Sequence, residues 1–175
     1  MNKNKERRFI MFFGLKRSTS KHFHPKFMYF CNLLERTDMQ MKEETTYKPD
    51  YSSSMASHLG ILFLPSTDET VRAEMPVDHR TSQPFGLLNG GASLALAEIV
   101  AGHGSMSLCR KDEYACGVQV SGNHISTVPL GGKVIATGRL IHRGQSSHIW
   151  NIDIATPEGR LVSTVRVVNF ILKQQ

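Results

Sequence analysis

The 175-residue sequence has few cysteines and lacks any long apolar run. Its cysteines are Cys31, Cys109 and Cys116, too few and too irregularly spaced for a disulfide framework or a zinc site. No segment approaches the roughly 18 apolar residues that a membrane-spanning helix needs. We therefore predict one domain with its own hydrophobic core in a reducing compartment, with buried structural cysteines and without a metal or a membrane span.

An excess of one charge is also lacking over most of the chain, although the formal net charge is +6. Nine of the 21 Lys and Arg residues, but only three of the 15 Asp and Glu residues, lie in residues 1–40. Residues 41–175 therefore hold 12 charges of each sign. Composition gives no case for DNA or RNA binding by this larger part of the chain.

The basic N-terminal region has no sustained helical or strand period. We predict an unstructured leader and polar connector over residues 1–54, followed by a domain over residues 55–175. The leader lacks the apolar core and cleavage site of a secretory signal. Two interpretations stay open: an organelle transit peptide, or sequence upstream of a true start at Met39 or Met41. We expect a cytoplasmic protein, with organelle targeting as the alternative.

Strand patterns on both sides of one helical stretch indicate the fold class. The helical stretch runs from Asn89, a favoured N-cap, to about Cys109, which corresponds to about 30 Å of helix. The strand patterns cover residues 60–64, 71–77, 115–121, 133–140, 148–155 and 161–171. This order predicts an α+β fold in which an antiparallel sheet wraps around one long central helix.

One carboxylate lies in the otherwise apolar run of the predicted helix. The residues three and four positions from Glu98 are Leu94, Ala95, Ala101 and Gly102, so no charged neighbour on that face would pair with it. Burying an ionised carboxylate without a partner is costly. We interpret Glu98 as a residue exposed at a cleft or kept for chemistry, and the alternative is an ordinary solvent-facing glutamate.

A paired glycine, Gly90 and Gly91, opens the same helix. Free N–H groups at a helix start suit an oxyanion, although the pair also fits a tight loop without further function. With Glu98 and the loop amide Gln83, it predicts an acyl-transfer site. Gly90 and Glu98 are about 12 Å apart along one helix, whereas one carbonyl needs both within about 3 Å. If they cooperate, they come from two chains of a homodimer.

These residues carry a resemblance to a known family. The sequence resembles the hotdog-fold acyl-CoA thioesterases of the PaaI-like group, most of all the 1,4-dihydroxy-2-naphthoyl-CoA hydrolase and hydroxybenzoyl-CoA thioesterase branch. The likeness is carried by His58–Ile61, Ala73–Val77, Gln83–Leu88, Gly90–Ser93 and Ala97–Glu98. It implies a hotdog fold and hydrolysis of an aryl- or medium-chain acyl-CoA, with CoA as part of the substrate and no cofactor. It also implies homodimers that pair into homotetramers.

The resemblance implies roles for individual residues. Glu98 would act as base or nucleophile, the Gly90 amide would polarise the thioester carbonyl, and Gln83 would hold the acyl or carbonyl end. Arg143 and the loop hydroxyls beside it would contact CoA phosphates. Asn89 completes the predicted catalytic set, and the predicted substrate-binding residues are Phe85, Gly91, Gly102, Asn123, His124, Arg143, Ser146 and Ser147.

Two positions depart from the family pattern. Asn89 stands where the family usually has His, and Gly102 stands where close relatives have Ser or Thr. An asparagine can donate a hydrogen bond to a carbonyl but cannot carry a proton. These departures leave a second function open, an acyl-CoA-binding hotdog module with weak or no hydrolysis. Dehydratase chemistry on the same fold is disfavoured because it commonly relies on a catalytic His that position 89 lacks.

Overall fold

The computed structural model describes residues 49–67 and 69–174. The predictions for the leader, including Cys31 and the two candidate start methionines, lie outside these residues. No helix in the two ranges is both long enough and apolar enough to cross a membrane.

The secondary structure follows the predicted order of two strands, one long helix and four strands. In the described residues a short helix, which the sequence patterns do not predict, precedes the first strand. The elements are α3 (Met55–His58), β1 (Leu62–Leu64), β2 (Thr70–Pro76), α4 (Gly90–Met106), β3 (Glu113–His124), β4 (Lys133–Arg143), β5 (Ser147–Ala155) and β6 (Leu161–Lys173).

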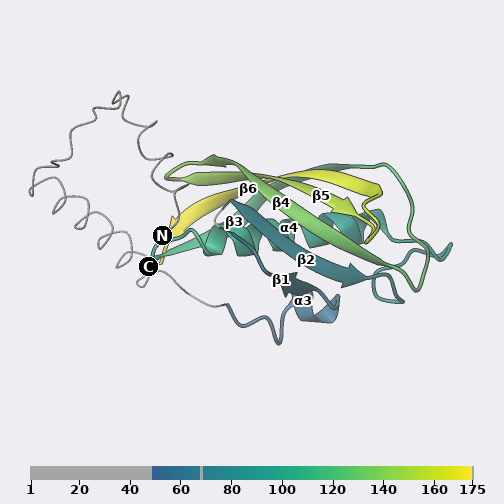
Figure 1. Cartoon of the computed structure of the whole chain (residues 1–175). Coiled ribbons are helices and arrows are strands. Elements are labelled where there is room, and N and C mark those ends of the chain that lie inside the picture. Colours follow the sequence, from purple (N-terminus) through teal and green to yellow (C-terminus); the bar gives the residue numbers. More distant parts are fainter. Residues whose placement is uncertain (1–48, 68, 175) are drawn as a thin grey trace, which may run out of the picture. The chain divides into compact units, whose positions relative to one another are not determined.

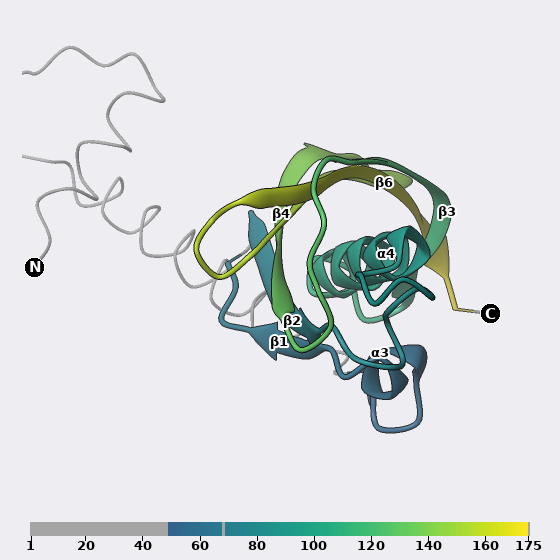
Figure 2. The same cartoon turned by 90° about the vertical axis from the view of Figure 1, so that its right-hand side faces the viewer.

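The six strands form one sheet in the order β1-β2-β4-β5-β6-β3. Every neighbouring pair is antiparallel. Figure 1 shows the sheet lying along α4, and the view turned by 90° in Figure 2 shows that it curls around the helix. This architecture is the predicted α+β fold. β3 directly follows α4 in the sequence. In the sheet it pairs with β6 at the end of the order, so β3 is an outer strand.

The inner face of the sheet packs on the apolar side of α4. Alternating residues of β2 and the residue after it, which include Val71 and Met75, are at most 1% exposed, as the period-two pattern predicts. Trp150 of β5 is also buried, and its Nε1–H donates to the Ser105 Oγ of α4 at 2.9 Å. Asn169 of β6 donates to the same oxygen at 2.9 Å. These bonds fix the end of the helix to two strands.

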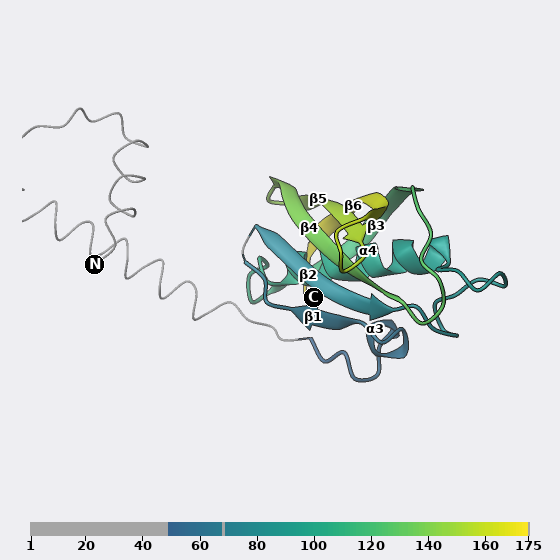
Figure 3. The ribbon, with the colours of Figure 1, turned by 45° about the vertical axis from the view of Figure 1, so that its right-hand side comes forward.

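The segment before α3 contacts the domain, although the sequence predicts it as part of a connector. The Tyr51 ring lies 4.8 Å from the ring of Phe63 in β1, and its hydroxyl lies 3.0 Å from the Nδ1 atom of His103 in α4. His103 also stacks on Phe63. Figure 3 shows α3 and β1 beside β2 at this end of the sheet. The contacts of Tyr51 therefore attach residues before α3 to the sheet and to the helix.

Candidate active site

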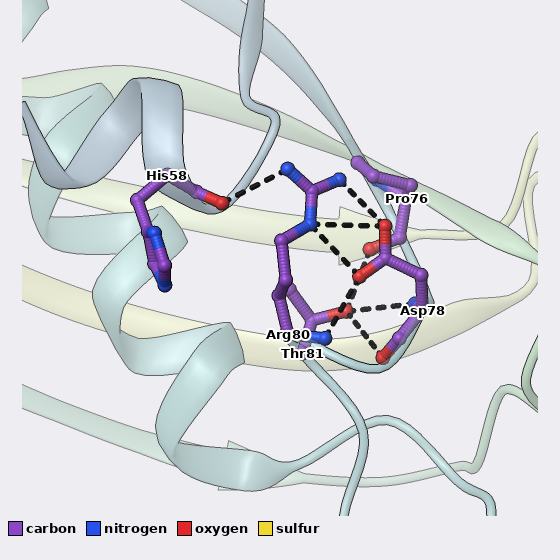
Figure 4. Close-up of polar contacts among 5 residues, drawn as sticks. All are labelled: His58, Pro76, Asp78, Arg80 and Thr81. Carbon is purple, nitrogen blue, oxygen red and sulfur yellow. Dashed lines mark hydrogen bonds and ion pairs between the residues drawn. The ribbon is translucent and has the colours of Figure 1, made fainter.

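A small polar cluster directs the chain as it leaves β2 (Figure 4). The Asp78 carboxylate accepts from Nε and Nη2 of Arg80, and the third guanidinium nitrogen, Nη1, donates to the His58 carbonyl at 2.9 Å. Thr81 Oγ1 donates to the Pro76 carbonyl at 2.8 Å. Hydrogen bonds from Arg80 lower the pKa of Asp78 to about 2, so this carboxyl is ionised near neutral pH. The cluster links the end of β2 to the last residue of α3.

The loop after this cluster carries Gln83 to the start of α4. The N–H of Asn89 donates to the Thr81 carbonyl at 2.9 Å, which ties the loop to the helix start. A turn closed from Gly86 N–H to the Gln83 carbonyl lies between them, and Gly86 has a φ of 74°, a conformation that favours glycine. The Gln83 side-chain oxygen accepts from the Phe85 N–H at 2.9 Å. The Phe85 ring projects from this turn and is 87% exposed.

Asn89 caps α4, as the sequence predicts. Its Oδ1 atom accepts from the Gly91 N–H at 2.7 Å. The paired glycine therefore does not present two free amides, because the cap occupies one of them. Among the described residues, the Gly90 N–H has no acceptor. Gly90 thus supplies a free donor at the positive end of the helix dipole.

His124 lies at the same end of the helix. A Cβ atom on Gly90 would lie 2.6 Å from His124 Nε2, so the imidazole packs directly on this glycine. The other ring nitrogen, Nδ1, lies 3.0 Å from Oγ of the buried Ser163. The structure therefore brings an imidazole to the helix start from β3, even though position 89 is Asn. Asn123, the adjacent residue of β3, lies at this end as well.

Glu98 lies two turns further along α4 and is exposed. Its carboxylate rests on Gly117 of β3, where an added Cβ would lie closer than 3.0 Å to Oε1. Within the described ranges, no hydrogen bond or ion pair engages this carboxylate. Gly117 is not among the predicted site residues, although an isolated glycine in a strand pattern is a sign of a bulge or a close backbone approach.

The face of α4 that carries Glu98 follows β3 at intervals of four residues. One turn before Glu98, Leu94 lies 3.1 Å from the position of a Cβ on Gly122. Two turns after it, the Met106 sulfur lies 3.1 Å from the Ala115 nitrogen. Between them, a Cβ on Gly102 would meet no atom within 4 Å. The structure therefore places the predicted binding residue Gly102 beside an open space, one turn from the carboxylate.

The other predicted CoA-binding residues lie at the opposite end of the helix. Arg143 Nη2 approaches the carbonyl of Leu108, beyond the C-terminal end of α4, at 3.5 Å. Ser146 lies in the neighbouring turn, and Ser147 begins β5. Leu108 is about 27 Å along the helix direction from its first residue, where His124 lies. Both groups are among the predicted substrate-binding residues, but within one chain they are far apart.

The two described cysteines differ from each other. Cys109 is 5% exposed, and burial raises the pKa of its thiol to about 11, with Glu113 acting in the same direction. A thiol in this environment is a poor nucleophile. Cys116 lies on β3 and is exposed. The prediction of buried structural cysteines is therefore confirmed for Cys109 and wrong for Cys116, because β3 is an outer strand.

Comparison with known proteins places this chain in a family. The model of the thioesterase superfamily matches residues 85–163. The proofreading thioesterase EntH of Cronobacter sakazakii is 39% identical over 119 residues, which span 68% of this chain and 86% of EntH. The crystal structure of the thioesterase HI1161 from Haemophilus influenzae has a TM-score of 0.69 at 34% identity and covers 74% of this chain and 94% of its own.

A mutant of the thioesterase PA1618 from Pseudomonas aeruginosa gives the same TM-score of 0.69 at 33% identity, with 75% of this chain and 99% of that chain covered. The residues that the family model matches include α4 and strands β3, β4 and β5. With this coverage and identity, the chain belongs to the thioesterase superfamily and is a thioester hydrolase with the hotdog fold.

Proposed function

We propose that this hydrolase cleaves an aryl- or medium-chain acyl-CoA to the free acid and CoA. The observation that carries the proposal is the Glu98 carboxylate, which is exposed on α4 and has no pairing partner among the described residues. Family membership supports the reaction, thioester hydrolysis. The CoA moiety and the acyl class rest on the likeness of the Gln83–Glu98 segment to PaaI-like enzymes.

Two routes use Glu98 in this reaction. In one, its carboxylate attacks the carbonyl carbon, the C–S bond breaks, and water then hydrolyses the resulting anhydride. In the other, Glu98 accepts a proton from a water molecule as that water attacks the carbonyl, and the C–S bond breaks in the same way. Both routes release CoA and the acid, and both place negative charge on the carbonyl oxygen. The Gly90 N–H is suited to stabilise this oxyanion.

The geometry of Gln83 supports a role in holding the substrate carbonyl or acyl end. Its side-chain oxygen is occupied by the Phe85 N–H, so the amide Nε2 is the group that remains to donate. The exposed ring of Phe85 offers an apolar contact for an aryl or alkyl group on the same turn. His124 adds a polar group beside Gly90. This set lies at one end of α4, whereas Glu98 lies two turns away.

We propose that a homodimer brings Glu98 and Gly90 together, with each site shared by two subunits. Within the described residues β3 pairs only with β6, so the other edge of β3 is free. This edge strand is 12 residues long, and a long edge strand is a template for pairing with a second copy. Its exposed apolar side chains, and that of the residue after it, are Tyr114, Val118, Val120 and Ile125.

Contacts within one chain support one register for such a dimer. Glu98 lies on Gly117, and Gly90 lies against His124 on the same strand. To bring Glu98 to Gly90 of the partner subunit, Gly117 of one β3 must lie opposite His124 of the partner subunit. The two β3 strands are then antiparallel, and each dimer has two equivalent sites.

This register places the twofold axis at Ser121. On β6, Gly117 pairs with Asn169. His124 pairs with Ser163, which is six residues away on the same strand. Ser121 lies midway between the two pairs on this ladder. Directly opposite residues of antiparallel strands have Cα atoms about 4.5 to 5.5 Å apart, so Ser121 is expected to face Ser121 of the partner subunit.

A cysteine introduced at Ser121 tests this register. In a Cys116→Ser background, Ser121→Cys is expected to form an intersubunit disulfide on mild oxidation, because the Cα separation suits such a bond. Non-reducing electrophoresis measures the cross-linked dimer. Gln119→Cys is the control, since two ladder steps separate it from the axis and its own copy lies out of reach. Equal cross-linking at the two positions would contradict the proposed register.

A thiol-release screen tests the reaction itself. The full-length protein is incubated with aryl, short-chain, medium-chain and long-chain acyl-CoAs, and free CoA is measured with a thiol reagent. We expect the highest kcat/KM for an aryl or medium-chain ester. Calorimetric binding of these esters without thiol release would instead favour the binding module. Turnover of short-chain or long-chain esters alone would contradict the proposed acyl class.

A further inference from the structure

Gly117 lies at an irregular point of β3. It pairs with Asn169 of β6, and Gln119 pairs with the adjacent Val168. Val118 is therefore an extra residue without a partner on β6, which defines a β-bulge. Bulges bend the strand locally and commonly redirect side chains next to active sites. In this chain the bulge coincides with the place where α4 brings a carboxylate onto the strand.

The distal half of the Glu98 side chain lies against Gly117. A Cβ atom at position 117 would lie 3.4 Å from Cγ and 3.3 Å from Cδ of Glu98, and closer than 3.0 Å to Oε1. Any side chain at this position would occupy the space that the carboxylate fills. Because no polar group of the described residues holds the carboxylate, the packing against this glycine determines how close to β3 it lies.

We propose that Gly117 is a positioning residue for the Glu98 carboxylate. The absence of a side chain at the bulge lets the carboxylate lie directly on β3, at the level from which it reaches the carbonyl polarised by Gly90 of the partner subunit. This inference rests on the proposed function of Glu98. Gly117 makes no contact with the substrate in this role and acts through Glu98.

Gly122, a second glycine of β3, also lies close to neighbouring atoms, but it does not position a carboxylate. A Cβ at Gly122 would lie 2.8 Å from a methyl group of Val165 and 3.1 Å from the Thr164 carbonyl oxygen. These are a branched side chain and backbone, which do not move easily. At Gly117 the closest atom is the end of a flexible side chain. Alanine is therefore expected to displace the carboxylate at Gly117 but to strain the packing at Gly122.

The matched variants Gly117→Ala and Gly122→Ala separate positioning from folding. For Gly117→Ala we expect kcat to fall about 10- to 100-fold, as for a reacting group displaced by about 1 Å. KM is expected to change less than about threefold, since the binding residues are untouched. For Gly122→Ala we expect the larger decrease in Tm. The proposal would be overturned if a lower Tm accounted for the loss of kcat in Gly117→Ala and its crystal structure showed the Glu98 carboxylate unmoved.

The Glu98→Asp variant distinguishes positioning of the carboxylate by Gly117 from a purely structural role of this glycine. The shorter side chain withdraws the carboxylate by one methylene, which leaves room for the methyl group of Gly117→Ala. Single-turnover rates are measured for both single variants and for the double variant. In the Glu98→Asp background, Gly117→Ala is expected to lower the rate less than about threefold, so the two changes are strongly non-additive.

Two failures are distinguishable. If Glu98→Ala retains full turnover, the proposed function of Glu98 is wrong, and the proposed role of Gly117 is then wrong as well. If Glu98→Ala is inactive while Gly117→Ala has normal kcat, or if Gly117→Ala causes the same loss in both backgrounds, only the inference about Gly117 is overturned. A crystal structure of Gly117→Ala is the second readout, and it is expected to show Glu98 Oε1 moved away from β3.

Discussion

Replacing Glu98 with alanine is expected to lower kcat about 10²- to 10⁴-fold, the usual contribution of a general base. The isosteric Glu98→Gln variant is expected to lose as much, because an amide neither accepts the proton of water nor attacks the carbonyl. Both rates are measured by thiol release at saturating acyl-CoA. Binding of a CoA ester, measured by calorimetry, should change little, since neither substitution removes a group that holds the substrate before reaction.

A second carboxylate provides the matched control for this experiment. Glu158 lies in the exposed turn between β5 and β6 and belongs to neither α4 nor β3. Glu158→Gln removes one negative charge from the chain, as Glu98→Gln does, and is expected to leave kcat unchanged. If Glu98→Ala retained more than about one third of the wild-type kcat, Glu98 would be neither base nor nucleophile.

Mixing two inactive variants is expected to restore about a quarter of the wild-type activity. One variant is Glu98→Ala, and the other is Gln83→Ala, which removes a donor from the opposite end of the site and is expected to cost about 10²-fold or more. Random exchange makes about half of the dimers mixed. In a mixed dimer one site carries both defects, and the other combines wild-type Glu98 from one chain with wild-type Gln83 from the other.

The control for this experiment mixes Glu98→Ala with Glu98→Gln, which cannot assemble an intact site in any dimer. Activity is followed by thiol release after subunit exchange, and formation of mixed dimers is verified with two different affinity tags. If Glu98 and Gln83 of the same chain formed each site, mixed dimers would contain no intact site and no activity would return. The complementation therefore tests the 12 Å separation that one helix imposes on Gly90 and Glu98.

Local patterns in the sequence were enough to predict the order of the strands and the long helix α4, although not the short helix α3. The Asn89 side chain caps α4, and the helix ends three residues before Cys109, where the pattern loses its helical composition. The alternation of β2 gives buried residues at each second position. Helix caps and strand periodicity depend on residues close together in the chain. The isolation of Glu98 on its helix face is visible for the same reason.

The tertiary structure alone decided which distant residues meet. The packing of His124 on Gly90 and the position of Glu98 on Gly117 depend on how β3 crosses α4 and on a bulge in that strand. Strand order explains why Cys116 is exposed. None of these follows from a local pattern, because contacts between distant segments are set by the register and curvature of the whole sheet.

The same reasoning applies to the predicted CoA-binding residues. The sequence motif contains Asn123, His124 and the turn with Arg143, but it carries no information on their separation. The structure places the turn beyond one end of α4 and His124 at the other. The sequence thus determined the residue types of the candidate site and the helix on which its carboxylate lies. Packing of the sheet on the helix decided which of these residues lie close together, because that packing fixes the distances on which the chemistry depends.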